Sequence, residues 1–78
     1  MGAPTDETID ALIIELRDQE EGVRSCAARG LGMLGVAARR AVPELLRIAY
    51  EDNSYMQGRA RQELKKIDPE AAARAGAK

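Results

Sequence analysis

Apolar residues recur along this chain with the three- and four-residue spacing of amphipathic helices. At about 100° per residue they form four stripes, which predict helices over about 6–18, 21–34, 38–51 and 55–67. The inward positions are Ile9, Leu12, Ile13 and Leu16; Val23, Ala27, Leu31 and Leu34; Val42, Leu45, Leu46 and Ala49; and Met56, Ala60, Leu64 and Ile67. Ile48 and Tyr50 widen the third stripe. We therefore expect an all-α protein whose helices each bury one side.

Residues between the stripes predict where the helices begin and end. Thr5 is a suitable N-cap for the first helix, and Gly35 is suited to end the second in the left-handed conformation. Pro43 predicts that the third helix begins properly only near Ala41, with 37–40 as a looser turn.

The fourth helix is bounded by similar signals. Asn53 or Ser54 is expected to cap its start, and Asp68 with Pro69 to stop it. The stretch 70–75 is expected to add one helical turn as a cap, and the last residues to fray.

Small residues interrupt the second helix. Gly30 and Gly32 each cost about 1 kcal/mol relative to alanine, which predicts a close approach of another element. Gly32, Ser25 and Arg29 are expected to point away from the inward stripe, and Cys26 to lie at its edge.

The chain repeats itself at a shift of 33 positions. The eight pairs of inward positions that superimpose are Ile9/Val42, Leu12/Leu45, Ile13/Leu46, Leu16/Ala49, Val23/Met56, Ala27/Ala60, Leu31/Leu64 and Leu34/Ile67. Amphipathic periodicity explains matches within one helix, but it does not set the length of the turn between two helices. We therefore interpret the chain as two copies of one helix pair.

The motifs of these two copies resemble HEAT repeats, of the short variety named after phycobilisome lyases. The resemblance covers about 9–73 and rests on Asp18, Val23-Arg24, Ala27-Ala28, Leu31-Gly32, Leu34-Gly35, Ala41-Val42-Pro43 and the ending Ile67-Asp68-Pro69-Glu70. Two positions depart from the family pattern. Gln57 stands where the arginine matched by Arg24 would fall, and Asp10 stands where Pro43 would fall.

The resemblance implies a right-handed α-solenoid of two HEAT-like helix pairs, four helices plus a short C-terminal cap. The chain would be a single domain over 1–78, with repeat one over about 5–35, repeat two over about 38–68 and a cap or tail over 69–78. The first and third helices would line the convex face, and the second and fourth the concave face. The partner-binding candidates on the concave face are then Ser25, Arg29, Met33, Tyr55, Arg59, Gln62 and Lys66.

The composition indicates that the chain has no catalytic site and that neither disulfides nor metal ions stabilise its fold. The chain has 78 residues, one cysteine and no histidine, so a disulfide, an imidazole base and a histidine metal site are excluded within it. Cys26 has no histidine partner and is interpreted as a structural thiol. The acidic cluster of Asp18, Glu20 and Glu21 is interpreted as a solvated turn. We expect no enzyme activity, no cofactor and no metal.

Charge is unevenly placed although the net charge is only −1. The segment 1–21 is acidic and the segment 22–47 is basic, which would suit head-to-tail contacts between copies. A set of basic residues offers phosphate contacts for a nucleic acid: Arg29, Arg59, Arg61, Lys65 and Lys66. The net charge and the lack of stacking aromatics count against that hypothesis. Without an apolar segment of membrane-spanning length or a signal peptide, we expect a soluble cytoplasmic protein.

Self-association is expected because solenoids usually need at least about three repeats and polar end caps. Ile14 lies off the inward stripe and is our candidate oligomer contact, in a homodimer or higher homo-oligomer. The link 35–38 is a possible hinge for exchange of helices between copies. We therefore predict a non-enzymatic protein-interaction or scaffold module that binds a protein partner through the concave face. The alternatives are an accessory subunit of a phycobilin-lyase-like enzyme, a nucleic-acid backbone binder or an engineered repeat protein.

Overall fold

The computed structural model describes residues 6–51 and 54–76, and every regular element in these ranges is a helix. The elements in chain order are α1 (Asp6–Glu15), α2 (Glu21–Leu34), the 3₁₀ helix η1 (Gly35–Ala41), α3 (Val42–Glu51), α4 (Ser54–Ile67) and α5 (Pro69–Gly76). The expected caps Thr5 and Asn53 lie outside the described residues.

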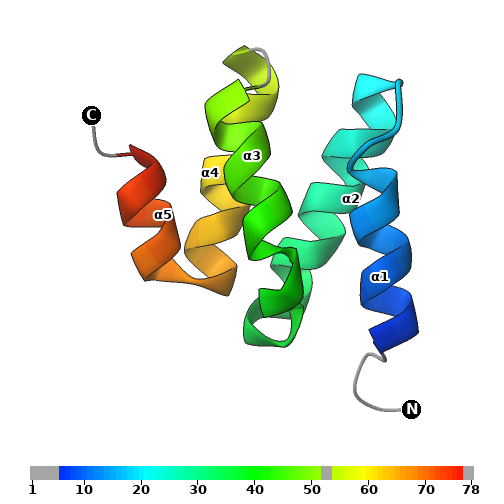
Figure 1. Ribbon diagram of the computed structural model, residues 1–78, viewed down its shortest axis with the longest axis horizontal. Coiled ribbons are helices and arrows are strands. Elements are labelled where there is room, and N and C mark those ends of the chain that lie inside the picture. The colour runs from blue at the N-terminus through cyan, green and yellow to red at the C-terminus, as the bar shows by residue number, and fades with distance from the viewer. Residues whose placement is uncertain (1–5, 52–53, 77–78) are drawn as a thin grey trace.

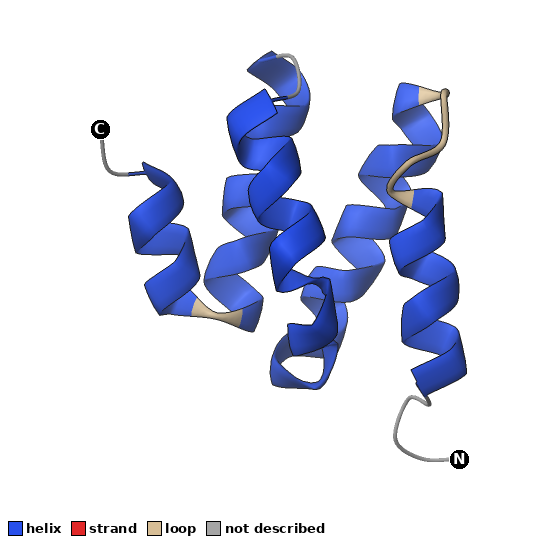
Figure 2. Ribbon diagram, in the orientation of Figure 1, coloured by secondary structure: helices blue, strands red, loops and turns tan. Residues whose placement is uncertain are grey.

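The helices form two layers (Figures 1 and 2). In Figure 1, α1 and α3 lie in front, α2 and α4 lie behind them, and α5 closes the end beside α3 and α4. The described residues extend 40 × 28 × 15 Å, so the row of helices is much longer than the two layers are deep. Helices α2 and α4 lie side by side. Ser25 contacts Tyr55 near the start of both helices and Gly32 faces Glu63 near their ends, so the two helices run in the same direction.

The predicted inward stripes form the core. All sixteen inward positions are buried or half-buried, which confirms the helical interpretation of the pattern. Ile48 is fully buried as expected, but Tyr50 is 58% exposed, so the stripe does not widen that far. The Tyr50 hydroxyl instead donates a hydrogen bond of 3.4 Å to the Arg74 carbonyl on α5.

The end of the first helix differs from the sequence-based expectation. Helix α1 ends at Glu15 rather than near Asp18, because Arg17 N and Asp18 N bond to carbonyls only three residues back. The chain then turns, and α2 begins at Glu21 as predicted. Gly35 ends α2 with φ of 63°, in the region that favours glycine.

The looser turn expected before α3 is the 3₁₀ helix η1. Ala38 and Ala41 are fully buried, and η1 contacts α1, α2, α3 and α4. Within the candidate hinge 35–38, Ala38 is therefore fixed in the core, whereas Val36 and Ala37 are exposed.

Helix α5 is the expected C-terminal cap. The Asp68 carboxylate accepts hydrogen bonds from the main-chain N–H groups of Glu70 and Ala71, which satisfies the first turn of α5. Ala71, Ala72 and Ala75 are buried, so α5 packs closely on α3 and α4 through small side chains.

Salt bridges connect α1 and the turn after it with α3 and η1. The Arg17 guanidinium donates to both carboxylate oxygens of Glu44 at 3.1 Å, and Arg47 donates to Glu44 from the same helix at 2.6 Å. Arg40 of η1 bonds to Asp10 of α1 at 2.8 Å. The contacts of Arg17 with Glu44 and of Arg40 with Asp10 join residues 27 and 30 positions apart in the chain.

Candidate interaction face on helices α2 and α4

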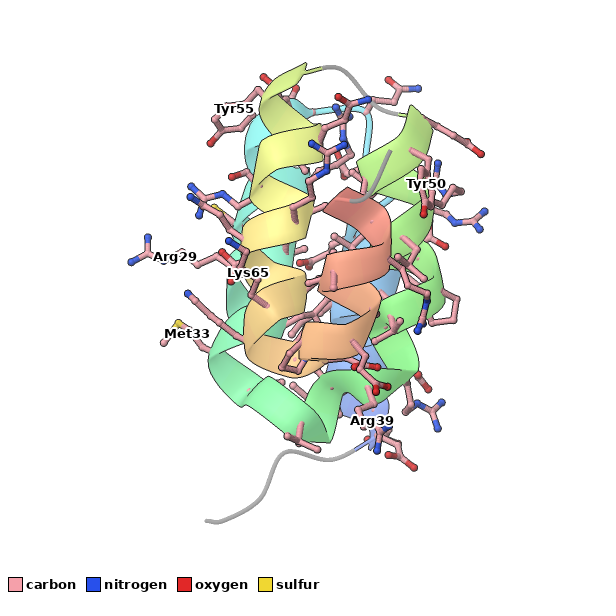
Figure 3. The ribbon with its side chains drawn as sticks, turned by 90° about the vertical axis from the view of Figure 1, so that its left-hand side faces the viewer. Arg29, Met33, Arg39, Tyr50, Tyr55 and Lys65 are labelled. Carbon is pink, nitrogen blue, oxygen red and sulfur yellow. The ribbon has the colours of Figure 1, made fainter. Side chains whose placement is uncertain are left out.

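The seven candidate residues all lie on α2 and α4, the two helices of the back layer. Arg29, Met33, Tyr55, Gln62 and Lys66 are exposed. Ser25 and Arg59 are half-buried. Figure 3 shows Tyr55, Arg29 and Met33 one below the other along this side, with Tyr50 on the opposite side of the molecule. We call this side the α2–α4 face.

Ser25 and Tyr55 connect the two helices at one end of the face. Ser25 Oγ lies 3.1 Å from Tyr55 Oη, within hydrogen-bond distance. The pKa of the Tyr55 phenol is lowered, first because Ser25 hydrogen-bonds its oxygen and then because of the Arg59 guanidinium. The contact with Ser25 holds the Tyr55 side chain in place, although the residue is 53% exposed.

Glu63 is the residue that the sequence reasoning missed. Its side chain is only 1% exposed, and it is the centre of a charged cluster on α4. Arg59 Nη1 donates a hydrogen bond of 3.1 Å to Glu63 Oε2, and Lys66 Nζ lies 3.3 Å from Oε1 as an ion pair. A glutamate directly before inward Leu64, with cations four residues before it and three after it, is the signal in the sequence that could have found it.

Gly32 creates the space for this buried carboxylate. Gly32 is itself buried, which corrects the expectation that it points away from the inward stripe. A Cβ at this position would fall on Glu63 Oε1, 2.9 Å from Cδ and 3.2 Å from Cβ. The absent side chain therefore lets the two helices enclose Glu63, which is the close approach that the helix-interior glycine predicted.

The residues of the face form one polar row. It runs from Ser25 on α2 to Tyr55, Arg59, Glu63 and Lys66 along α4. The pKa of Arg59 is raised, first by hydrogen bonding to Tyr55 and then by Glu63, so its guanidinium stays charged. Four of the seven candidates are thus brought together by contacts, and the fifth member of the row is Glu63.

Gly58 leaves a hollow on the outer side of α4. The hollow has a volume of about 330 Å³ and is lined by Tyr55, Gly58, Arg59 and Gln62. A Cβ at position 58 would meet nothing within 4 Å, so the glycine is not required by packing. Gln62 therefore belongs to the face as the edge of this hollow.

Arg29 and Met33 lie on the α2 side of the face. Met33 is 75% exposed, and Arg29 is also exposed. Cys26 is exposed as well, which corrects the expectation that it lies at the core edge. The α2–α4 face thus combines two exposed apolar side chains, Met33 and Tyr55, with several cations.

A second hollow lies away from this face, at the turn between α1 and α2. It has a volume of about 500 Å³ and is lined by Leu16, Arg17, Asp18, Gln19, Arg24 and Arg47. The Arg24 side chain reaches back over the turn, where its Nη1 donates hydrogen bonds to the carbonyls of Asp18 and Gln19, at 2.8 and 3.1 Å. The arginines here maintain the turn and the contact with α3.

Comparisons with protein-family models, with curated proteins and with solved structures give no match for this chain. Among the residues that the structure describes, no group of three His, Cys, Asp or Glu side chains is placed to hold a metal ion. The helices within the described ranges are all too short or too polar to cross a membrane.

Proposed function

We propose that this chain is a non-enzymatic protein-interaction module built as a right-handed α-solenoid of two HEAT-like helix pairs. In this proposal α1 and α3 form the convex layer and α2 and α4 the concave layer. The α2–α4 face then binds a protein partner. Support for the architecture comes from the two-layer row of helices, the parallel course of α2 and α4 and the shift of 33 positions between matching inward residues.

The organised α2–α4 face is the observation that carries the functional proposal. Arg59 is held by Glu63, and Tyr55 by Ser25, so these side chains have already lost much of their freedom. A binding partner therefore meets groups that need little further ordering, which favours affinity. Exposed Met33 and Tyr55 are of the types enriched at protein interfaces.

Site-specific photocrosslinking tests this proposal. A photoreactive amino acid at position 33 should capture one partner, whereas the same group at Pro43, exposed near the start of α3, should not. Arg29→Glu should abolish the capture, and Arg39→Glu, an exposed charge reversal in η1, should leave it intact. Equal capture from positions 33 and 43 would refute the assignment of this face.

Self-association is the second part of the proposal. Ile14 is 72% exposed on α1, as the sequence indicated. Leu12 on α1 and Val23 on α2 remain only half-buried, and Figure 1 shows no helix beyond the α1–α2 pair on the side away from α3 and α4. A second copy that covers these residues would bury apolar surface, which stabilises association.

Sedimentation velocity distinguishes a monomer from a dimer or higher assembly. We expect a dimer or higher assembly that Ile14→Glu weakens, whereas Val36→Glu, an equally exposed apolar position in η1, should not change it. A monomer at high protein concentration would refute this part of the proposal without affecting the partner-binding part.

A further inference from the structure

The hollow over Gly58 has polar groups on its walls and one charge. Arg59 supplies a guanidinium, Gln62 an amide and Tyr55 a phenol. Arg59 uses Nη1 for Glu63, while its buried Nε has no hydrogen-bond partner in the structure. A guanidinium presents five N–H donors and no acceptor, and the Arg59 side chain is 28% exposed, so the hollow offers N–H donors other than the buried Nε to an incoming group.

The charge around the hollow is positive. Glu63 is enclosed between α2 and α4, and its carboxylate is matched by Arg59 and Lys66. Arg29 and Lys65 are exposed along the same side, and Figure 3 shows both, with Lys65 on α4 and Arg29 projecting from α2. Glu21, at the start of α2, is close enough to Tyr55 to affect its pKa. On this side of the molecule the cations therefore outnumber the carboxylates by four to two: Arg29, Arg59, Lys65 and Lys66 against Glu21 and Glu63.

The exposed apolar side chains decide which kind of anion fits. Met33 and Tyr55 lie near opposite ends of the face, so an occupant meets apolar surface at both ends and cations between them. A peptide carries aliphatic and acidic side chains together, whereas a nucleic-acid backbone offers phosphates without aliphatic groups. This combination favours a peptide over a nucleic acid.

We infer that the α2–α4 face takes an acidic peptide segment of the partner and that the hollow over Gly58 receives one of its carboxylate side chains, against Arg59 and Gln62. The inference rests on the proposed function, since it names the chemistry of the partner. Tyr55 borders the hollow, and Gly32, next to Met33, faces Glu63, so the stretch of α4 from Tyr55 to Glu63 measures the distance along the face from the hollow to Met33. Its eight residues span about 12 Å, which about four extended residues cover. The segment therefore carries its carboxylate and its apolar side chain about four positions apart.

Binding of two matched synthetic peptides tests the inference, with ¹⁵N NMR of the full chain as the readout. The first peptide combines Asp and Glu with Leu, and the second replaces each Asp and Glu by Asn and Gln. The acidic peptide should shift the Gly58 amide, the Gln62 side-chain amide and the Arg59 Nε–H signal. It should leave Ala73, on the exposed side of α5, unshifted.

Filling the hollow provides the decisive variant. Gly58→Gln places a helix-forming side chain in the hollow, where a Cβ meets open space, so the fold should be at least as stable as the original. Its affinity for the acidic peptide should fall at least about tenfold. The matched control Ala73→Gln adds the same side chain at an exposed helical position and should bind as the original does.

Each other outcome overturns the inference. Equal binding of the neutral peptide would show that a carboxylate is not recognised, while the face could still be an interaction surface. Binding of neither peptide at millimolar concentration would reject the acidic segment, and the crosslinking experiment would still decide the proposed function separately. Tighter binding of a short DNA duplex with the same shifted signals would reassign the hollow to phosphate.

Discussion

Replacing Gly32 by alanine should destabilise this protein, against the usual effect of Gly→Ala in a helix. Alanine in a helix interior gains about 1 kcal/mol over glycine. At Gly32, however, the new Cβ would fall on the Glu63 carboxylate and come within 3.2 Å of Glu63 Cβ. Glu63 must then leave its enclosed position, which separates it from Arg59 and Lys66.

The magnitude follows from these opposing terms. Forcing extra volume into a packed site typically costs about 1–3 kcal/mol, and leaving a buried charge without its partners costs more still. Because the end of the glutamate can swing toward solvent, we expect a net loss of about 1–2 kcal/mol. In a domain of this size, that lowers Tm by roughly 4–16 °C.

Gly30→Ala is the matched control. Position 30 lies in the same helix, and its Cβ would lie 3.6 Å from the Leu12 methyl groups, an ordinary contact. The same substitution should therefore raise stability by about 0.5–1 kcal/mol. Thermal unfolding followed by circular dichroism should separate the two variants by roughly 6–24 °C.

A double-mutant cycle identifies the cause. In a Glu63→Ala background, Gly32→Ala should lose most of its cost, because the carboxylate that it displaces is absent. The reasoning would be refuted if Gly32→Ala alone raised Tm as much as Gly30→Ala, or if its cost were unchanged without Glu63.

Three further predictions concern other parts of the fold. Burial alone would raise the pKa of Glu44, but hydrogen bonds from Arg17 and Arg47 give a net lowering below the ordinary value of 4.5. The ionised Glu44 carboxylate therefore stabilises the fold above that value, and this stabilisation is lost as the pH falls through the lower pKa of the folded state. Glu44→Gln should make the free energy of unfolding less dependent on pH below about pH 5. Asp68→Ala removes the acceptor at the start of α5 and should cost about 0.5–2 kcal/mol in urea unfolding, and an unchanged midpoint would contradict the capping role. Gly35→Ala forces a side chain onto a residue with φ of 63° and should cost about 1–3 kcal/mol, whereas a gain would show that the turn after α2 adapts freely.

The amphipathic pattern by itself determined which residues are inside and where most helices lie. The sixteen predicted inward positions are all buried or half-buried, and α2 has the bounds expected from its pattern. Helical periodicity is a local property, so it can be read from neighbouring residues without knowledge of other helices. The same holds for Arg24, which reaches back over a turn only five or six residues away.

Only the tertiary structure decided how the α2–α4 face is organised. Gly32 and Glu63 are distant in the sequence, and each looks unfavourable alone, one as a helix-interior glycine and the other as a charge beside an inward stripe. Their meaning appears only when α2 and α4 lie side by side and the missing Cβ encloses the carboxylate. In the same way, the packing of η1 and the exposure of Cys26 depend on which helices surround each position, and that arrangement is not encoded in any single helix.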